Sequence, residues 1–227
     1  MEPLESGTES SHQPTNGRSE GKDATAAGDG GSRLAGRMLR RWLRPALLIG
    51  AAVLVAVSYF LTYWQITLHA PQYPNGLTVR ISITSVKGDV SEVNELNHYI
   101  GMMTMDQVAK PIRAFWPYGV VVLIVVFVVA AFIRHWIGSV LAIAGATYPF
   151  IFAGGLYYYL NYAGHHLDPS AALSGAVPPF TPAFMGSKMV GQFETVASFG
   201  AGFWLALVAT VLAVIAAVLG FRRTAHR

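Results

Sequence analysis

Four long apolar runs follow residue 44 and limit what this chain can fold into. None of them contains Asp, Glu or Lys, and they cover residues 45–66, 116–137, 138–162 and 198–221. Each run is long enough to cross a hydrocarbon core of about 30 Å as a helix. Only 12% of all residues are charged, whereas soluble domains carry about 25%. The sequence therefore predicts an all-α membrane protein with four transmembrane helices.

The distribution of Lys and Arg around these runs predicts the orientation of the chain. Basic residues cluster before the first run, at Arg134 between the second and third runs, and after the fourth. Basic flanks stay on the cytoplasmic side. We therefore expect a multi-pass protein of the bacterial cytoplasmic (inner) membrane with both termini in the cytoplasm. Tryptophans near the expected membrane surfaces agree with this arrangement, namely Trp64, Trp116, Trp136 and Trp204.

The segments between the runs have distinct compositions. Residues 1–32 hold almost no large apolar side chains, which predicts disorder. Residues 77–84 alternate apolar and polar side chains like a half-buried strand, and a helix is expected over 91–109. The predicted parts are a disordered basic cytoplasmic tail (1–44), transmembrane helix 1 (45–66), a small α/β extracytoplasmic module (67–115), transmembrane helices 2 and 3 (116–162), a Pro-rich extracytoplasmic loop (163–197), and transmembrane helix 4 with a short basic tail (198–227).

The segment Leu96–Met105 carries one histidine and three methionines in a chain that has no cysteine. Imidazole and thioether groups form a soft ligand set that favours Cu(I). On a continuous helix, His98, Met102 and Met105 are spaced i, i+4 and i+7 and share one face, whereas Met103 falls on the packing stripe. Gly101 is unfavourable inside a helix, and a break there would separate these side chains.

Further histidines are expected on the same side of the membrane. His69 follows the first run, and His165 and His166 stand close to Asp168 in the second outer segment. The four runs contain no methionine, although methionine is a good core filler. These observations predict an extracytoplasmic copper site with His98, Met102 and Met105 as primary ligands, completed by His165, His166 and His69 if the outer segments meet.

Each of these features has an ordinary structural interpretation as well. The methionines within residues 102–105 suit an adaptable apolar contact surface. The stretch from His165 to Asp168 is also typical of a solvated loop, and His69 is also typical of a residue at the membrane surface.

Other kinds of chemistry have little support in the sequence. We expect no enzymatic activity and no nucleotide, because no glycine-rich phosphate loop occurs. We also expect no haem, because the chain has no cysteine for Cys-x-x-Cys-His attachment and no paired histidines inside the apolar runs. The basic residues suit anionic lipid, so no nucleic acid partner is expected.

Four short strings form a combined pattern: APQYPNGL (70–77), GDVSE (88–92), LNHYIGM (96–102) and GQF (191–193). Together they resemble small four-span bacterial membrane proteins encoded beside nitrous-oxide-reductase maturation genes. The resemblance covers residues 60–215, and LNHYIGM is its most specific element. It implies an extracytoplasmic setting in which copper is delivered to an exported enzyme, and it supplies no mechanism. Met103 and Met105 lie outside the matched string.

The leading hypothesis is an integral membrane accessory protein. It would bind copper at the outer His/Met site and assist delivery to, or assembly of, an exported copper enzyme. The alternative is a metal-free structural subunit that docks on a partner membrane complex, such as a permease or an oxidoreductase. Both hypotheses place the chain in the lipid bilayer beside a membrane-protein or exported partner.

Overall fold

The structure is a computed structural model that describes residues 42–225 except residues 71, 134, 174, 176–177 and 191–192. The chain divides into two units, Met1–Trp42 and Leu43–Arg227. The architecture given below is that of the second unit. The predicted tail up to residue 41 and the predicted cytoplasmic Arg134 lie outside the described residues.

Three stretches of helix are long and apolar enough to cross a membrane. They are Ala114–Phe132, Trp136–His165 and Ala201–Arg222, and they indicate that the protein is embedded in lipid. The second stretch is interrupted at Thr147, the residue before Tyr148 and Pro149. The helices that contain these stretches are α3 (Met105–Phe132), α4 (Trp136–Ala146), α5 (Tyr148–His165) and α6 (Ala201–Ala225).

The prediction of four transmembrane helices is wrong for the first apolar run. Within the described residues the helix Trp42–Ser58 is apolar but shorter than the three candidate spans. At 1.5 Å per residue it covers about 25 Å, less than a hydrocarbon core of about 30 Å. The chain then turns and enters a β-strand at Thr62. The apolar side chains after residue 61 therefore fill a sheet core and do not extend the helix.

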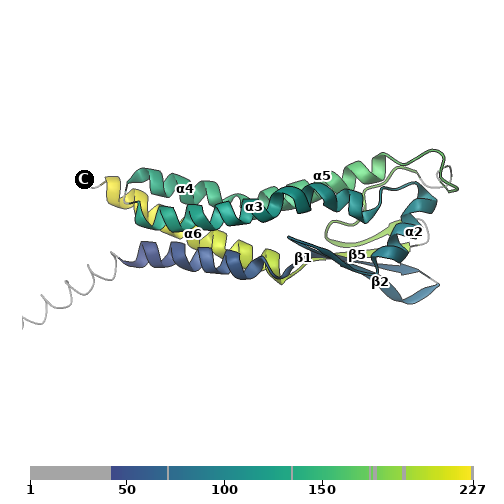
Figure 1. Ribbon diagram of the computed structural model, residues 1–227, viewed down its shortest axis with the longest axis horizontal. Coiled ribbons are helices and arrows are strands. Elements are labelled where there is room, and N and C mark those ends of the chain that lie inside the picture. The colour runs from purple at the N-terminus through teal and green to yellow at the C-terminus, as the bar shows by residue number, and fades with distance from the viewer. Residues whose placement is uncertain are drawn as a thin grey trace, which may run out of the picture. The chain divides into compact units, whose positions relative to one another are not determined.

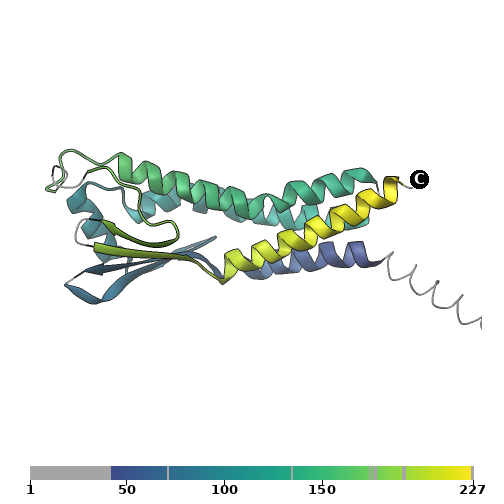
Figure 2. The same cartoon turned by 180° about the vertical axis from the view of Figure 1, so that it is seen from behind.

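A five-stranded antiparallel sheet replaces the small module that was expected between the first two runs. The strand order is β3-β2-β1-β5-β4, and the sheet is adjacent to the end of the helices where α3 and α6 begin (Figures 1 and 2). Both outer segments build it, so the region predicted as a Pro-rich loop contributes two strands. The strands are β1 (Thr62–Ala70), β2 (Tyr73–Ser82), β3 (Val86–Gly88), β4 (Gly186–Val190) and β5 (Phe193–Phe199).

One face of the sheet is the core of this region, and α2 (Val90–Ile100) packs against it. Val93 of α2 is fully buried, like Trp64 of β1 and Val79 of β2. The turn into α2 is tight because Gly88 has φ +104° and lies against the Thr78 carbonyl. The expected strand over 77–84 overlaps β2, and the expected helix begins within one residue of α2.

The sheet is joined to the helices by close backbone contact and by a buried polar chain. The Gly200 amide, at the start of α6, donates to the Tyr63 carbonyl over 3.0 Å. The Tyr63 hydroxyl lies 2.7 Å from the Ser58 hydroxyl and accepts a 3.2 Å hydrogen bond from Tyr148. These contacts connect β1, α5, α6 and the helix Trp42–Ser58, so the sheet has a fixed position on the helices.

Candidate functional site

The helix that was expected over 91–109 ends at Gly101. This residue adopts a left-handed conformation with φ 77° and caps α2, and its amide donates toward the Asn97 and His98 carbonyls. Glycine is favoured here because a left-handed residue with a Cβ is strained. A new helix, α3, begins at Met105 behind a capping box formed by Thr104 and Gln107. The continuous helix was therefore a wrong prediction.

The two outer segments meet at this break. The Asp168 amide donates to the Gly101 carbonyl over 2.8 Å, and the Leu173 amide donates to the Tyr99 carbonyl over 2.9 Å. A Cβ at Gly101 would lie 2.5 Å from the Asp168 carbonyl oxygen and 2.8 Å from its nitrogen. Gly101 is thus required twice, once by its backbone conformation and once by this close approach.

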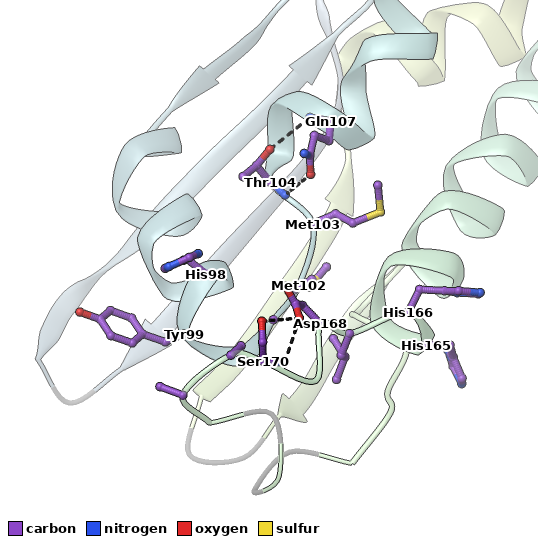
Figure 3. Close-up of a pocket in the computed structure, with 14 residues that line it drawn as sticks. His98, Tyr99, Met102, Met103, Thr104, Gln107, His165, His166, Asp168 and Ser170 are labelled. Atoms are coloured by element: carbon purple, nitrogen blue, oxygen red, sulfur yellow. Dashed lines mark hydrogen bonds between the residues drawn. The ribbon is translucent and has the colours of Figure 1, made fainter.

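A pocket of about 740 Å³ opens at the junction. One rim is the C-terminal end of α2 with the loop to α3, and the other is the end of α5 with the segment that follows it (Figure 3). It brings together soft and borderline metal donors from positions more than 60 residues apart in the sequence. The donor side chains that line it are His98, Met102, Met103, His165, His166 and Asp168.

The break at Gly101 redistributes the three methionines. Met102 is 7% exposed and Met105 is 6% exposed, so the free face expected for them does not exist. Met103, which was expected to pack, is half-buried and lines the pocket. The loop is held by two asparagines of α2: Asn97 donates to the Met103 carbonyl over 3.3 Å, and Asn94 accepts from the Met105 amide over 2.7 Å.

Two adjacent histidines, His165 and His166, lie at the end of α5. Their hydrogen bonds indicate which ring nitrogen of each carries the proton. Nδ1 of His165 lies 2.8 Å from the Asn161 carbonyl, and Nδ1 of His166 lies 3.0 Å from the Tyr162 carbonyl. Because a carbonyl can only accept, Nδ1 carries the proton and Nε2 keeps its lone pair in the neutral ring. Metal-binding histidines commonly have this arrangement. His166 also stacks on Tyr162, with ring centroids 3.9 Å apart.

Asp168 carries the negative charge of the pocket. Its side chain accepts hydrogen bonds from the Ser170 amide at 2.9 Å and the Ser170 hydroxyl at 2.7 Å. These bonds, with a smaller electrostatic contribution from His98, hold the pKa of Asp168 below its usual range. The carboxylate therefore remains charged at mildly acidic pH.

Two of the sequence-predicted ligands lie away from this pocket. His69 is on β1, and its imidazole lies against Gly76 of β2. Met105 instead borders a separate apolar cavity of about 280 Å³ between α2 and the sheet. Of the six predicted ligands, the pocket is lined by four: His98, Met102, His165 and His166.

The donor types in the pocket fit a soft metal ion, but their present directions do not converge. Figure 3 shows His98 on one side of the loop, while the imidazoles of His165 and His166 point away from it on the other. In the part of the chain that the structure describes, no three His, Asp or Glu side chains are grouped closely enough to hold a metal. An ion that used both rims would require these rings to turn.

Comparison with known proteins adds no relative. No family model matches the chain, and no curated protein matches it either.

Proposed function

We propose that this protein is a membrane-embedded accessory protein that binds Cu(I) in the pocket between the two outer segments and presents it to an exported copper enzyme. The observation that supports this most strongly is the pocket lining, which combines three imidazoles with the thioethers of Met102 and Met103. Such mixed donors favour Cu(I) over hard cations. The resemblance to proteins of copper-enzyme maturation clusters supports the same setting.

The proposed ligand set follows from which donors have an available electron pair at the pocket. His165 and His166 offer Nε2, because Nδ1 of each is bound to a backbone carbonyl. Met103 extends from the loop toward the helix that carries them (Figure 3). His98 supplies the opposite rim, with the charge of Asp168 nearby to offset that of a cation. The histidines are exposed, so their rings have room to turn toward an ion, and His165 and His166 give up their Nδ1 hydrogen bonds to the backbone when they do so.

Copper uptake is expected to depend on the pocket histidines. The full-length protein in detergent is titrated with Cu(I) against a competing chelator. One equivalent of bound Cu(I) should be lost in the triple variant His98→Ala, His165→Ala, His166→Ala. The exposed residue His135 provides the matched control. It precedes α4 and therefore lies at the opposite end of the Trp136–His165 span from His165. The His135→Ala variant should retain this equivalent. Equal uptake by the triple variant and the unmodified protein would contradict the proposal.

The proposed function also requires the pocket to face away from the cytoplasm. The chain has no cysteine, so a single introduced cysteine is the only thiol that a maleimide can label. The labelling therefore shows on which side of the membrane that position lies. Asn75→Cys, in the exposed part of the hairpin between β1 and β2, should react with a membrane-impermeant maleimide in intact cells. His135→Cys should react only after lysis. The reverse pattern would place the pocket in the cytoplasm and exclude delivery to an exported enzyme.

Two exposed apolar side chains near the pocket suit contact with a protein partner: Tyr99, which lines the pocket, and Leu173, which borders the adjacent apolar cavity. Tyr99 is 56% exposed and Leu173 is 48% exposed, and a backbone hydrogen bond joins the two residues. Contact surfaces contain contiguous exposed apolar side chains. In the copper proposal they contact the enzyme that receives the ion. In the alternative proposal, a metal-free subunit, they are the docking surface itself.

A further inference from the structure

The outer face of the sheet, opposite α2, places three possible metal ligands in one row. In the register of the strands, His69 of β1 is paired with Glu194 of β5, and Glu194 is paired with Met189 of β4. Directly paired residues of antiparallel strands project to the same face. All three side chains are exposed. They therefore form a row across three neighbouring strands, although His69 and Glu194 are 125 positions apart in the sequence.

The spacing of the strands allows the row to reach a common ion. Neighbouring strands lie about 4.8 Å apart, so Glu194 is flanked on each side by a donor whose Cβ is about 5 Å away. Methionine and histidine side chains are long enough to bend over the carboxylate between them. The row is held by the hydrogen-bonded register of β1 with β5 and of β5 with β4. Only side-chain torsions have to change for the three to converge.

The imidazole of His69 must turn to reach this row, because it lies on the β2 side of β1 whereas Glu194 is on β5, the other neighbour of β1. It now lies against Gly76 of β2, where a Cβ would be 3.0 Å from both Cε1 and Nδ1 of the ring. In the described part of the chain, the side chains of His69 and Glu194 form no ion pair or hydrogen bond with each other or with another residue. Their donor atoms are therefore available to a ligand.

We propose that His69, Glu194 and Met189 form a second Cu(I) site on the outer face of the sheet, separate from the pocket. The thioether selects a soft ion, the imidazole suits it, and the carboxylate offsets its charge. The pocket shares none of these residues. This site thus goes beyond the proposed function, and it can exist whether or not the pocket binds copper.

The test uses the full-length protein in which the pocket histidines are removed by His98→Ala, His165→Ala and His166→Ala. In Cu(I) titration against a chelator this parent should retain one equivalent. Adding His69→Ala and Met189→Ala should weaken that binding by more than about tenfold, because loss of even an outer-shell partner of a ligand costs about 10–100-fold in metal affinity. Glu194→Gln, which keeps the size and removes the charge, should weaken it to a smaller extent.

Met185→Ala is the matched control for Met189→Ala. Met185 is 65% exposed and Met189 is 63% exposed. Met185 precedes β4 and is not paired with β5, whereas Met189 is paired with Glu194. Binding should therefore be unchanged in Met185→Ala. X-ray absorption of the copper-loaded parent should show a sulfur neighbour that is lost in Met189→Ala and kept in Met185→Ala.

Separate outcomes decide the two proposals. A parent without pocket histidines that binds no Cu(I) overturns the second site, and so does unchanged binding after removal of His69 and Met189. Binding of Cu(II) with no binding of Cu(I) also overturns it. None of these results bears on the pocket, which is judged by the equivalent lost when its own three histidines are replaced in the unmodified protein.

Discussion

A Gly101→Ala variant is expected to lose the pocket while its membrane helices stay intact. The left-handed conformation of Gly101, with φ 77°, costs alanine about 1–2 kcal/mol. The added Cβ would also stand 2.5 Å from the Asp168 carbonyl oxygen. The segment after α5 must then move away, which breaks the hydrogen bond from the Asp168 amide to the Gly101 carbonyl. Loss of that bond adds about 1 kcal/mol.

Hydrogen–deuterium exchange measures this separation directly. In Gly101→Ala, the amides of Asp168 and Leu173 should exchange faster, while those in the middle of α3 and α6 should be unaffected. The Cu(I) equivalent assigned to the pocket should be lost together with this protection. Gly175→Ala is the control, because Gly175 lies in the same outer segment and has nothing within 4 Å of a built Cβ. Unchanged protection of Asp168 in Gly101→Ala would show that the two segments are not held at this point.

Local sequence signals for the break were present next to the candidate site. A glycine after an apolar stripe is a common helix C-cap, and Thr104 followed by Gln107 three residues later is a capping-box pattern. Together they mark a helix end at 101 and a helix start at 105. The i, i+4 and i+7 spacing places side chains on one face only within a continuous helix. Because the chain turns between α2 and α3, this spacing does not put His98, Met102 and Met105 on a shared face. This is why Met103 faces the pocket and Met105 does not.

The sheet could be predicted only in part. The alternation over 77–84 indicated β2, and Gln65, Thr67 and His69 alternate with apolar residues in the same way along β1. That second pattern was obscured because the apolar composition of the preceding helix continues through Trp64 and Ile66 without a charged residue to mark the end of the helix. Pairing of β1 with β5 joins residues more than 120 positions apart, and no local pattern reports such a pair. The location of His69 in the row with Glu194 was therefore not predictable from the sequence.

The apolar helices were predictable because hydropathy is a local property of the chain. The three later runs correspond to the three stretches of helix that are long and apolar enough to span a membrane. The first run failed because length alone does not separate a spanning helix from a shorter helix followed by a buried strand. Trp64 shows the difference most clearly. It was expected at the membrane surface, yet it is fully buried in the core of the sheet.

A Trp64→Ala variant is therefore expected to destabilise the sheet more than any other single replacement of a tryptophan. Trp64 is on the central strand β1 and is fully buried, and its indole nitrogen donates to the Phe184 carbonyl over 2.8 Å. Removing a buried tryptophan side chain costs about 3–5 kcal/mol. The Phe184 carbonyl, on the segment leading to β4, also loses its partner. The expected result is a large fall in the midpoint of thermal unfolding in detergent, with loss of strand signal in circular dichroism.

Two matched variants separate packing from the hydrogen bond and from membrane effects. Trp64→Phe keeps most of the buried ring and removes the donor, so its effect should be smaller than that of Trp64→Ala and close to the 1–3 kcal/mol expected for an unpartnered buried carbonyl. Trp204→Ala alters an exposed tryptophan of α6 that is 52% accessible, and little effect is expected. If Trp64→Ala unfolds at the same temperature as Trp204→Ala, the side chain of Trp64 does not hold the second outer segment on the sheet.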